Sequence, residues 1–268
     1  MHTACRMPDP ARVTIEPIAA FDDNYIWLLA RGRRAALVDP GSAAAAQAAL
    51  DARGLALDSI LVTHHHGDHT GGIDELVAAS GARVFAPARE AIADGARLVR
   101  DGDRLQVLDL TLQVIDVPGH TAGHVAYHAP ELEALFCGDT LFAAGCGRLF
   151  EGTAEQMLAS LRRLAALPGG TRVYCAHEYT LANLHFALAA DPDNAALRSR
   201  LRECTARRAR GLPTLPSTLD QERATNPFLR VAEPALRAAA ERRSPGAGRS
   251  DLSAFAALRA WKDVYRAP

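Results

Sequence analysis

The chain has 268 residues, of which 49% are hydrophobic and 23% charged, and its formal net charge is −1. This length suits one large domain or two modest ones, and the composition is ordinary for a globular protein. No apolar run approaches the roughly 18 residues of a membrane span, and the start lacks the apolar stretch of a secretory signal, so we expect a cytoplasmic protein.

The first two-thirds of the chain alternates short apolar runs with turns. Three helices are predicted between the apolar runs, at 42–53, 71–80 and 154–166, and Thr153 and Gln156 form a capping-box pattern at the start of the third. Strands mixed with helices favour an α/β protein whose helices pack outside its sheets. The predicted strands are 13–18, 24–30, 34–39, 59–64, 82–87, 110–118, 124–129, 133–139 and 171–177.

From about residue 178 the pattern becomes helical, which predicts a smaller C-terminal domain. A proline-rich loop is expected at 211–219 and a flexible connection at 244–250. We therefore divide the chain into a disordered extension (1–12), an α/β domain (13–180) and a helical domain (181–268). The predicted helices of the last domain are 178–190, 193–210, 232–243 and 251–264.

Charge is distributed unevenly between the two parts. Residues 1–190 carry 15 Arg against 22 Asp and Glu, a net charge of −7, whereas residues 191–268 carry 14 Arg and one Lys against nine acids, a net charge of +6. The basic segment could face an anionic ligand or be a solvated helical surface. Binding of nucleic acid would require a stronger basic patch or interleaved aromatic residues, and neither is evident.

The five cysteines are odd in number and form no CxxC pair. A disulfide framework and a thiolate zinc site are therefore not expected. Cys137 and Cys175 fall inside apolar strands and are predicted to be core residues.

Metal-binding residue types follow the apolar strands four times. Strand ends are rigid, and the loops after them can direct side chains into a cleft. A lone strand-end histidine is usually a satisfied polar group, but a tight cluster of titratable side chains is costly to bury without a partner. The candidates are His64, His66, Asp68 and His69 at and after the end of strand 59–64, His120 after strand 110–118, Asp139 at the end of strand 133–139 and His177 at the end of strand 171–177.

Imidazole and carboxylate groups of this kind suit zinc, iron or manganese. Seven ligands are too many for one ion that keeps an open position, but they suit two ions sharing a bridging carboxylate. Two metals roughly 3.5–4 Å apart can hold a bridging hydroxide as nucleophile and polarise a carbonyl. We expect two divalent ions, zinc first, with iron or manganese as alternatives.

The motifs THHHGDHTGG, PGHTAGH, FCGDTLF and YCAHEYT resemble those of the metallo-β-lactamase superfamily. Within it, FDDNYIWLL, AGCGRLFEG, HEYTLANLHFA, GLPTLPSTL and ATNPFLR resemble the hydroxyacylglutathione hydrolase (glyoxalase II) family. The resemblance covers roughly residues 13–268. It implies an αββα sandwich at 13–180 as the catalytic domain, with the α-helical C-terminal domain binding substrate.

The resemblance also assigns the metal ligands. One metal would be bound by His64, His66 and His120, and the other by Asp68, His69 and His177, with Asp139 bridging the two. His65 would then be an unused histidine that packs beside the site, and His124 would support the ligands rather than bind metal. No metal role is expected for His2, His128 or His185.

The implied substrate is S-D-lactoylglutathione or a related S-(2-hydroxyacyl)glutathione, an anionic thioester. The implied contacts to glutathione are Arg148, Phe150, Tyr179, Phe186, Arg259 and Lys262. Arg259 and Lys262 are three residues apart on a predicted helix, so both can face one ligand. Arg148 stands where lysine is common in the family and Phe150 where tyrosine is often found, so we expect weaker binding more readily than lost turnover.

Hydrolysis would release glutathione and D-lactate, the second step of methylglyoxal detoxification. A thiolate with a pKa of about 8.5 leaves with little protonation, so a metal-bridging hydroxide oriented or deprotonated by Asp68 would suffice. The alternatives are a mononuclear iron oxidoreductase resembling glutathione persulfide dioxygenases, and a non-catalytic glutathione- or metal-binding protein. We expect a monomer with no nucleic-acid or membrane partner.

Overall fold

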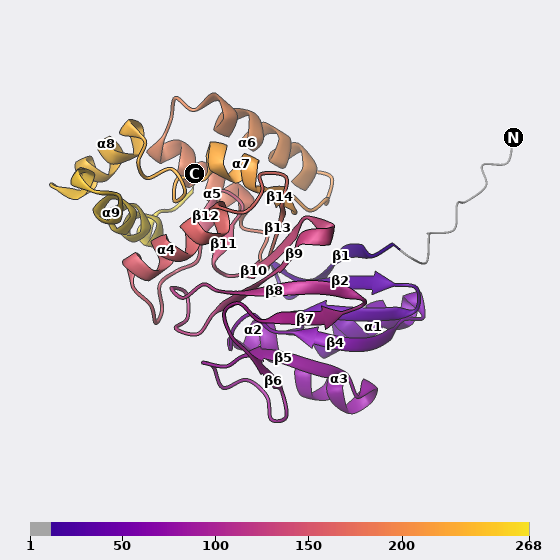
Figure 1. Ribbon diagram of the computed structural model, residues 1–268. Coiled ribbons are helices and arrows are strands. Elements are labelled where there is room, and N and C mark those ends of the chain that lie inside the picture. The colour runs from indigo at the N-terminus through magenta and orange to yellow at the C-terminus, as the bar shows by residue number, and fades with distance from the viewer. Residues whose placement is uncertain (1–11, 268) are drawn as a thin grey trace, which may run out of the picture.

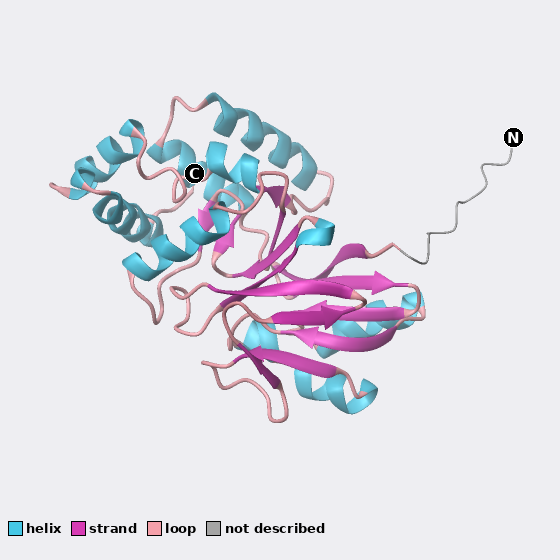
Figure 2. Cartoon of the chain, in the orientation of Figure 1, coloured by secondary structure: helices cyan, strands magenta, loops and turns pink. Residues whose placement is uncertain are grey.

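The computed structural model describes residues 12–267 (Figures 1 and 2). The predicted disordered extension lies outside the described residues, except for Arg12. Within the described part, two six-stranded sheets form the centre of the molecule and helices cover their outer faces. The predicted αββα sandwich is therefore confirmed.

The first sheet has the strand order β1-β2-β3-β4-β5-β6. β1 to β3 pair antiparallel, whereas β3, β4, β5 and β6 pair in parallel. The parallel strands therefore end at the same edge. The bounds are β1 Thr14–Ala20, β2 Asn24–Arg31, β3 Arg34–Val38, β4 Ala56–Leu61, β5 Arg83–Pro87 and β6 Arg97–Val99.

Alternating residues of this sheet pack on opposite faces, as the period of two in a strand requires. In β2, Trp27 and Leu29 join the core between the sheets, while Ile26 and Leu28 face the helices. The covering helices are α1 (Ala43–Arg53), which is capped by the Ser42 hydroxyl, and α3 (Ile73–Ser80).

The second sheet has the order β14-β13-β10-β9-β8-β7. β8 and β9, like β9 and β10, are antiparallel, and β10 pairs in parallel with β13. β8, β10 and β13 therefore run in one direction and end at one edge. The bounds are β7 Arg104–Val107, β8 Leu110–Asp116, β9 Val125–Ala129, β10 Ala134–Gly138, β13 Arg172–Cys175 and β14 Ser217–Thr218, with a separate ribbon of β11 Leu141–Phe142 and β12 Gly145–Cys146.

Helix α4 (Ala154–Ala165) covers the second sheet and begins with the predicted capping box. The Thr153 hydroxyl accepts from the Gln156 N–H, and the Gln156 side chain accepts from the Thr153 N–H. Met157, Leu161 and Leu164 are completely buried in the core that the helix shares with the strands. The helical spacing read from the sequence therefore marks the buried face.

The C-terminal part is helical, as predicted, and forms the orange-to-yellow group in Figure 1. Its buried Phe186, Phe228 and Phe255 belong to the same hydrophobic core as the second sheet, so the helices are packed onto the sandwich. The bounds are α5 Thr180–Ala190, α6 Ala195–Arg208, α7 Leu219–Thr225, α8 Pro234–Arg243 and α9 Asp251–Val264.

The connection at 244–250, which we expected to be flexible, is held in place. It contains the 3₁₀ turn η2 (Ala247–Arg249), and the Glu241 carboxylate accepts from the N–H groups of Gly246 (2.8 Å) and Gly248 (2.9 Å). The glycine and proline residues of segment 244–250 therefore form a hydrogen-bonded turn in the structure.

Several short elements are absent from the prediction, because a few residues carry too little periodicity to be recognised. They are β6, β7, β11, β12, β14, α7, the 3₁₀ turn η1 (Pro130–Leu132) and the one-turn helix α2 (Gly67–Thr70). Across residues 12–267, no helix combines the length and apolar character needed to cross a membrane.

Candidate metal centre and its cleft

The ends of four strands, one from the first sheet and three from the second, meet at one place beside the start of β2. Backbone hydrogen bonds join the sheets there: the Tyr25 N–H donates to the Ala176 carbonyl (2.7 Å), and the Glu178 N–H donates to the Asp23 carbonyl (2.9 Å). The loop after β4 carries four candidate ligands, and the loops after β8, β10 and β13 carry one each. The four strand-end motifs thus come together, as predicted.

Three histidines form the first group of donor atoms. The Nδ1 atom of His66 lies 3.1 Å from Nε2 of His64 and 3.1 Å from Nε2 of His120. Nitrogen ligands at about 2.0–2.1 Å from a tetrahedral ion lie roughly 3.3–3.4 Å apart. The spacing of the three nitrogens therefore suits coordination of a single ion.

Asp68, His69 and His177 form the second group, and Asp139 lies between the two. The Oδ2 atom of Asp68 is 3.4 Å from Nε2 of both His69 and His177. Oδ1 of Asp139 is 3.5 Å from Nε2 of His69 and 3.4 Å from Nε2 of His177, whereas its Oδ2 is 3.4 Å from Nε2 of His120. The two oxygens of Asp139 thus face different groups, as a bridging carboxylate requires.

Polar contacts at the far ring nitrogens orient three of these histidines. Nδ1 of His69 lies 3.1 Å from Asp39, Nδ1 of His177 lies 2.8 Å from Asp23, and Nδ1 of His120 lies 2.8 Å from the Arg148 carbonyl. Each partner favours a proton on Nδ1 and leaves Nε2 to bind metal. This arrangement is an independent indication that the donor set fits a metal.

The protonation tendencies of the two groups differ. Burial lowers the pKa of His64 and of His120, so these rings are neutral, as ligands must be. Burial is the largest influence on His69 and His177 and lowers the pKa of both, but the surrounding carboxylates, Asp139 first, together outweigh it, so both pKa values are raised. Burial would raise the pKa of Asp139, yet His69 and His177 hold it low, so this carboxylate is ionised.

His65 and His124 lie beside the donors, where the sequence placed them. His124 is buried, its ring stacks on His64 at 4.6 Å, and its Nε2 accepts from the Asp139 N–H at 3.1 Å. It therefore supports two ligands through packing and a hydrogen bond. His65 packs edge-on against His66, with 5.0 Å between the ring centroids, and its two ring nitrogens contact Glu90 and Glu151.

A cleft of about 390 Å³ opens beside His120 and Asp139. Five of the six residues predicted to contact substrate line it: Arg148, Phe150, Tyr179, Arg259 and Lys262. Phe186 does not. Its ring is completely buried, stacks with Phe228, and lies 5.7 Å from the Lys262 amine. The structure therefore places Phe186 in the packing beneath the cleft rather than on its surface.

Contacts within the cleft connect its residues to the donors. The Tyr179 ring stacks on His177 at 4.7 Å, with only 3° between the planes. Phe150 packs edge-on against His120 at 5.2 Å and is largely exposed. Asp263 accepts from Arg148 Nε and from an Arg259 terminal nitrogen, at 3.1 Å each. The two cations are therefore held side by side.

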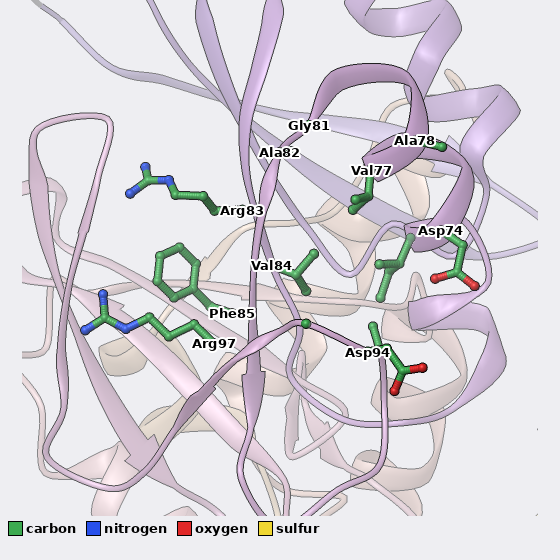
Figure 3. Close-up of a pocket in the computed structure, with 13 residues that line it drawn as sticks. Asp74, Val77, Ala78, Gly81, Ala82, Arg83, Val84, Phe85, Asp94 and Arg97 are labelled. Carbon is green, nitrogen blue, oxygen red and sulfur yellow. The ribbon is translucent and has the colours of Figure 1, made fainter.

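A second hollow, of about 450 Å³, lies beside α3 and β5 (Figure 3). Val77, Val84 and the acidic Asp74 and Asp94 gather on one side of β5, whereas Arg83, Phe85 and Arg97 lie on the other. Its charged side chains are exposed. This apolar, solvent-facing hollow contains no set of converging polar groups like that of the cleft.

Asp39 provides a test of how the ligands are oriented. Its Oδ2 contacts Nδ1 of His69, and its carboxylate also accepts the N–H and hydroxyl of Thr63, at 2.8 Å each. We expect Asp39→Asn to lower metal affinity about 10- to 100-fold, because the amide offers one acceptor oxygen instead of two. Competition with a chromogenic chelator measures this.

The control is Asp109→Asn, an exposed carboxylate that pairs with Arg34 far from the donors. Asp39 has a φ of 54°, a conformation that asparagine also tolerates, so the backbone should not change. An Asp39→Asn protein that binds metal as tightly as the control would show that the contact between Asp39 and His69 does not tune the site.

Comparison with known proteins adds independent information. A family model of the metallo-beta-lactamase superfamily matches residues 20–177, and a model of the hydroxyacylglutathione hydrolase C-terminus matches residues 178–265. A hydroxyacylglutathione hydrolase from Pseudomonas aeruginosa is 55% identical over 257 residues, covering 94% of this chain and 100% of that protein. One from Alkalilimnicola ehrlichii is 58% identical, with coverages of 93% and 98%. A crystal structure of TTHA1623, described as di-iron-bound, has 28% identity, a TM-score of 0.58 and coverages of 81% and 100%.

Proposed function

This chain belongs to the hydroxyacylglutathione hydrolase family of the metallo-β-lactamase superfamily, and we propose that it hydrolyses S-D-lactoylglutathione to glutathione and D-lactate. This reaction is the second step of methylglyoxal detoxification. The observation that carries the proposal is the shared location of the two sets of residues. The cationic and aromatic residues expected to hold glutathione line the same cleft as His120 and Asp139.

The metal complement is proposed to be two zinc ions. Seven donors in two groups, with one Asp139 oxygen toward each, support two ions rather than one. The di-iron-bound description of TTHA1623 supports the same number. Imidazole and carboxylate also suit iron and manganese, so metal analysis of the purified protein distinguishes these outcomes.

When bound, two such ions would activate a water molecule as nucleophile and polarise the thioester carbonyl. Asp68 is the protein group proposed to orient that water and take its proton. Its carboxylate is 41% exposed, against 9% for Asp139, and its contacts with Asn24, His69 and His177 all use Oδ2, so Oδ1 can meet a water. The Asn24 side chain donates to Asp68 Oδ2 at 2.9 Å and fixes its direction.

No cysteine in the described residues is suited to act as nucleophile. Cys137, Cys146, Cys175 and Cys204 are all buried. Burial raises the pKa of Cys146 to about 11 and that of Cys175 to about 12, so both remain thiols at neutral pH. The departing glutathione thiolate, by contrast, has a pKa near 8.5 and needs little help to leave.

The substrate side of the cleft is suited to an anion. Arg148 and Lys262 lie at its wall, with Arg259 partly beneath them and bonded to the Cys146 carbonyl at 2.8 Å. We propose that these three cations hold the glycine carboxylate of glutathione, and that Tyr179 and Phe150 flank the thioester. Charge and position, rather than a single hydrogen bond, would then orient the substrate.

The mononuclear iron oxidoreductase is not favoured. The C-terminal family model covers residues 178–265, which include Arg259 and Lys262 of the cleft, and relatives more than half identical over nearly the whole chain are named hydrolases. A non-catalytic binding protein is likewise disfavoured by the complete donor set.

We further propose a domain boundary near residue 180, a monomer, and a cytoplasmic location. The two family models meet between residues 177 and 178, which supports the boundary. Four free cysteines in the described part fit a compartment where glutathione keeps thiols reduced. The exposed large apolar side chains, such as Phe21, Leu98 and Leu252, come from separate segments, which supports a monomer.

The function is tested by hydrolysis of S-D-lactoylglutathione, followed through loss of the thioester absorbance. The matched control is His66→Ala. It removes the Nδ1 atom that lies 3.1 Å from Nε2 of both His64 and His120. We expect hydrolysis by the unmodified protein and little by the control. Equal rates in the two proteins would refute the proposal.

Lys262 gives a prediction about pH. Burial and the neighbouring Arg259 lower its pKa below the ordinary lysine value. Because the amine loses its charge earlier than an ordinary lysine, its contribution to anion binding is present at neutral pH and fades as pH rises. We expect KM to increase at alkaline pH, and Lys262→Met to raise KM roughly 10-fold at pH 7.

Lys262→Arg is the control, since arginine keeps its charge throughout this range. Its KM should stay flat where that of the unmodified protein rises. Parallel KM profiles for the two proteins, measured from initial rates between pH 7 and 10, would contradict a role for the Lys262 charge.

A further inference from the structure

His65 stands between two metal ligands in the sequence but faces two carboxylates in the structure. Its Nδ1 lies 3.1 Å from Oε2 of Glu90, and its Nε2 lies 3.2 Å from Oε1 of Glu151. Glu90 follows β5, and Glu151 precedes α4. The ring therefore joins the metal-binding loop after β4 to two other loops.

Glu90 forms the fixed side of this arrangement. Its side chain is 2% exposed, although it carries a carboxylate. Oε1 accepts from the Thr121 hydroxyl and from the Gly123 N–H at 3.0 Å. This oxygen therefore holds the loop around His120, while Oε2 contacts His65. A buried carboxylate with this many donors has little freedom to move.

Glu151 forms the other side and belongs to a segment that surrounds His120. The N–H groups of Phe150 (3.2 Å) and Glu151 (3.3 Å) donate to the His120 carbonyl, and the Arg148 carbonyl accepts from its ring. The Glu151 carboxylate also accepts from the Ala122 N–H at 2.9 Å. Residues 148–151 are thus attached at one side to His120 and its loop.

The same segment presents two cleft residues. Arg148 and Phe150 line the cleft, and the Phe150 ring packs edge-on against His66 at 5.6 Å. Between this segment and the loop 63–70, the described residues contain one polar side-chain contact, that of Glu151 with His65. The backbone bonds place the cleft wall against His120, and His65 is the polar side-chain link between that wall and the loop that carries His64 and His66.

We propose that His65 is a positioning residue, a clamp that holds the segment 148–151 against the metal-binding loop and so aligns Arg148 and Phe150 with the thioester. This role rests on the proposed function. The polar contacts of His65 are with Glu90 and Glu151, and it is proposed to bind neither metal nor substrate. It acts through Glu151, with Glu90 as the fixed support.

The test compares His65→Leu, His65→Gln, Glu151→Gln and the double variant His65→Leu/Glu151→Gln. We expect His65→Leu to keep its metal content and its kcat within about twofold, while KM rises roughly 3- to 10-fold, the scale of one lost hydrogen bond. His65→Gln, which can still donate, should recover much of the KM. The double variant should be no worse than His65→Leu, because both changes remove one contact.

Glu155→Gln is the matched control, since this carboxylate is exposed, lies four residues beyond Glu151 and makes no ion pair in the described structure. A KM for His65→Leu equal to that of the control would overturn the clamp. So would additive effects in the double variant, or loss of metal from His65→Leu, which would make His65 a support for the ligands instead.

Hydrogen–deuterium exchange separates failure of the clamp from failure of the proposed function. The amides of Phe150 and Glu151 should exchange faster in His65→Leu than in the unmodified protein, whatever reaction the protein catalyses. Unchanged exchange would refute the clamp even if the thioester is hydrolysed. Absence of hydrolysis by the unmodified protein would refute the function and leave the exchange result to decide on the clamp.

Discussion

Replacing Asp139 by asparagine is expected to lower kcat/KM for S-D-lactoylglutathione by about 10²- to 10³-fold, the scale for losing one key electrostatic contact in a site. Its two oxygens face the two donor groups separately, so an amide leaves one group without a charged ligand. It also removes the largest of the carboxylate charges that counter burial of His69 and His177. Bound metal should fall together with activity.

Asp116→Asn is the control, because Asp116 ends β8 near the same edge but contacts Arg89 instead of the donors. Initial rates and metal content are measured on the same preparations. An Asp139→Asn protein that keeps two metals per chain and a kcat/KM within threefold of the control would contradict the bridging role.

Replacing Arg200 by methionine is expected to destabilise the protein by about 3–5 kcal/mol, since it leaves a buried carboxylate uncompensated. Arg200 and Glu222 are 3% and 0% exposed, and they bond at 2.6 Å. The second oxygen of Glu222 accepts from the Ala144 N–H at 2.8 Å, in the loop that borders the cleft. The pair thus connects the C-terminal helices to the site.

Urea unfolding measures this loss, with Arg202→Met as a control on the exposed face of α6. The double variant Arg200→Met/Glu222→Gln should recover part of the stability, because the glutamine oxygen can still accept from Ala144 and no charge is buried alone. A free energy of unfolding for Arg200→Met within 1 kcal/mol of the control, on the order of what a surface change costs, would contradict this account.

The candidate metal ligands could be predicted from the sequence because each follows a recognisable apolar strand. His64, His120, Asp139 and His177 lie within a few residues of predicted strand ends, and the structure brings all four together. The rigidity of strand ends makes such positions informative. Their assignment as ligands of two specific ions stays a prediction.

The polar partners of the histidines in and beside the site could not be predicted in the same way. Asp23 lies 154 residues from His177 along the chain, and Glu90 lies 25 residues from His65. No sequence pattern around Asp23 or Glu90 predicts which histidine it contacts, because the contact depends on how distant loops pack together. For Asp39 the sequence gives only a weak indication of a role at the site, namely that it is an acidic residue at the end of the predicted strand 34–39.

Phe186 illustrates a different limit. The family resemblance placed it among the substrate contacts, and the helix containing it was predicted. Helix α5 is apolar on most of its surface, so periodicity does not tell which side faces the cleft. In the structure the ring lies against Trp261 and Phe228, beneath the lysine that lines the cleft.

The most direct test of a two-metal thioesterase site is titration of metal-free protein with zinc, following hydrolysis of S-D-lactoylglutathione at each addition. Two donor groups sharing Asp139 predict a thioesterase activity that reaches its plateau at two zinc ions per chain. Activity complete at one ion, or one bound iron with oxygen uptake on glutathione persulfide and no thioester hydrolysis, would contradict the account.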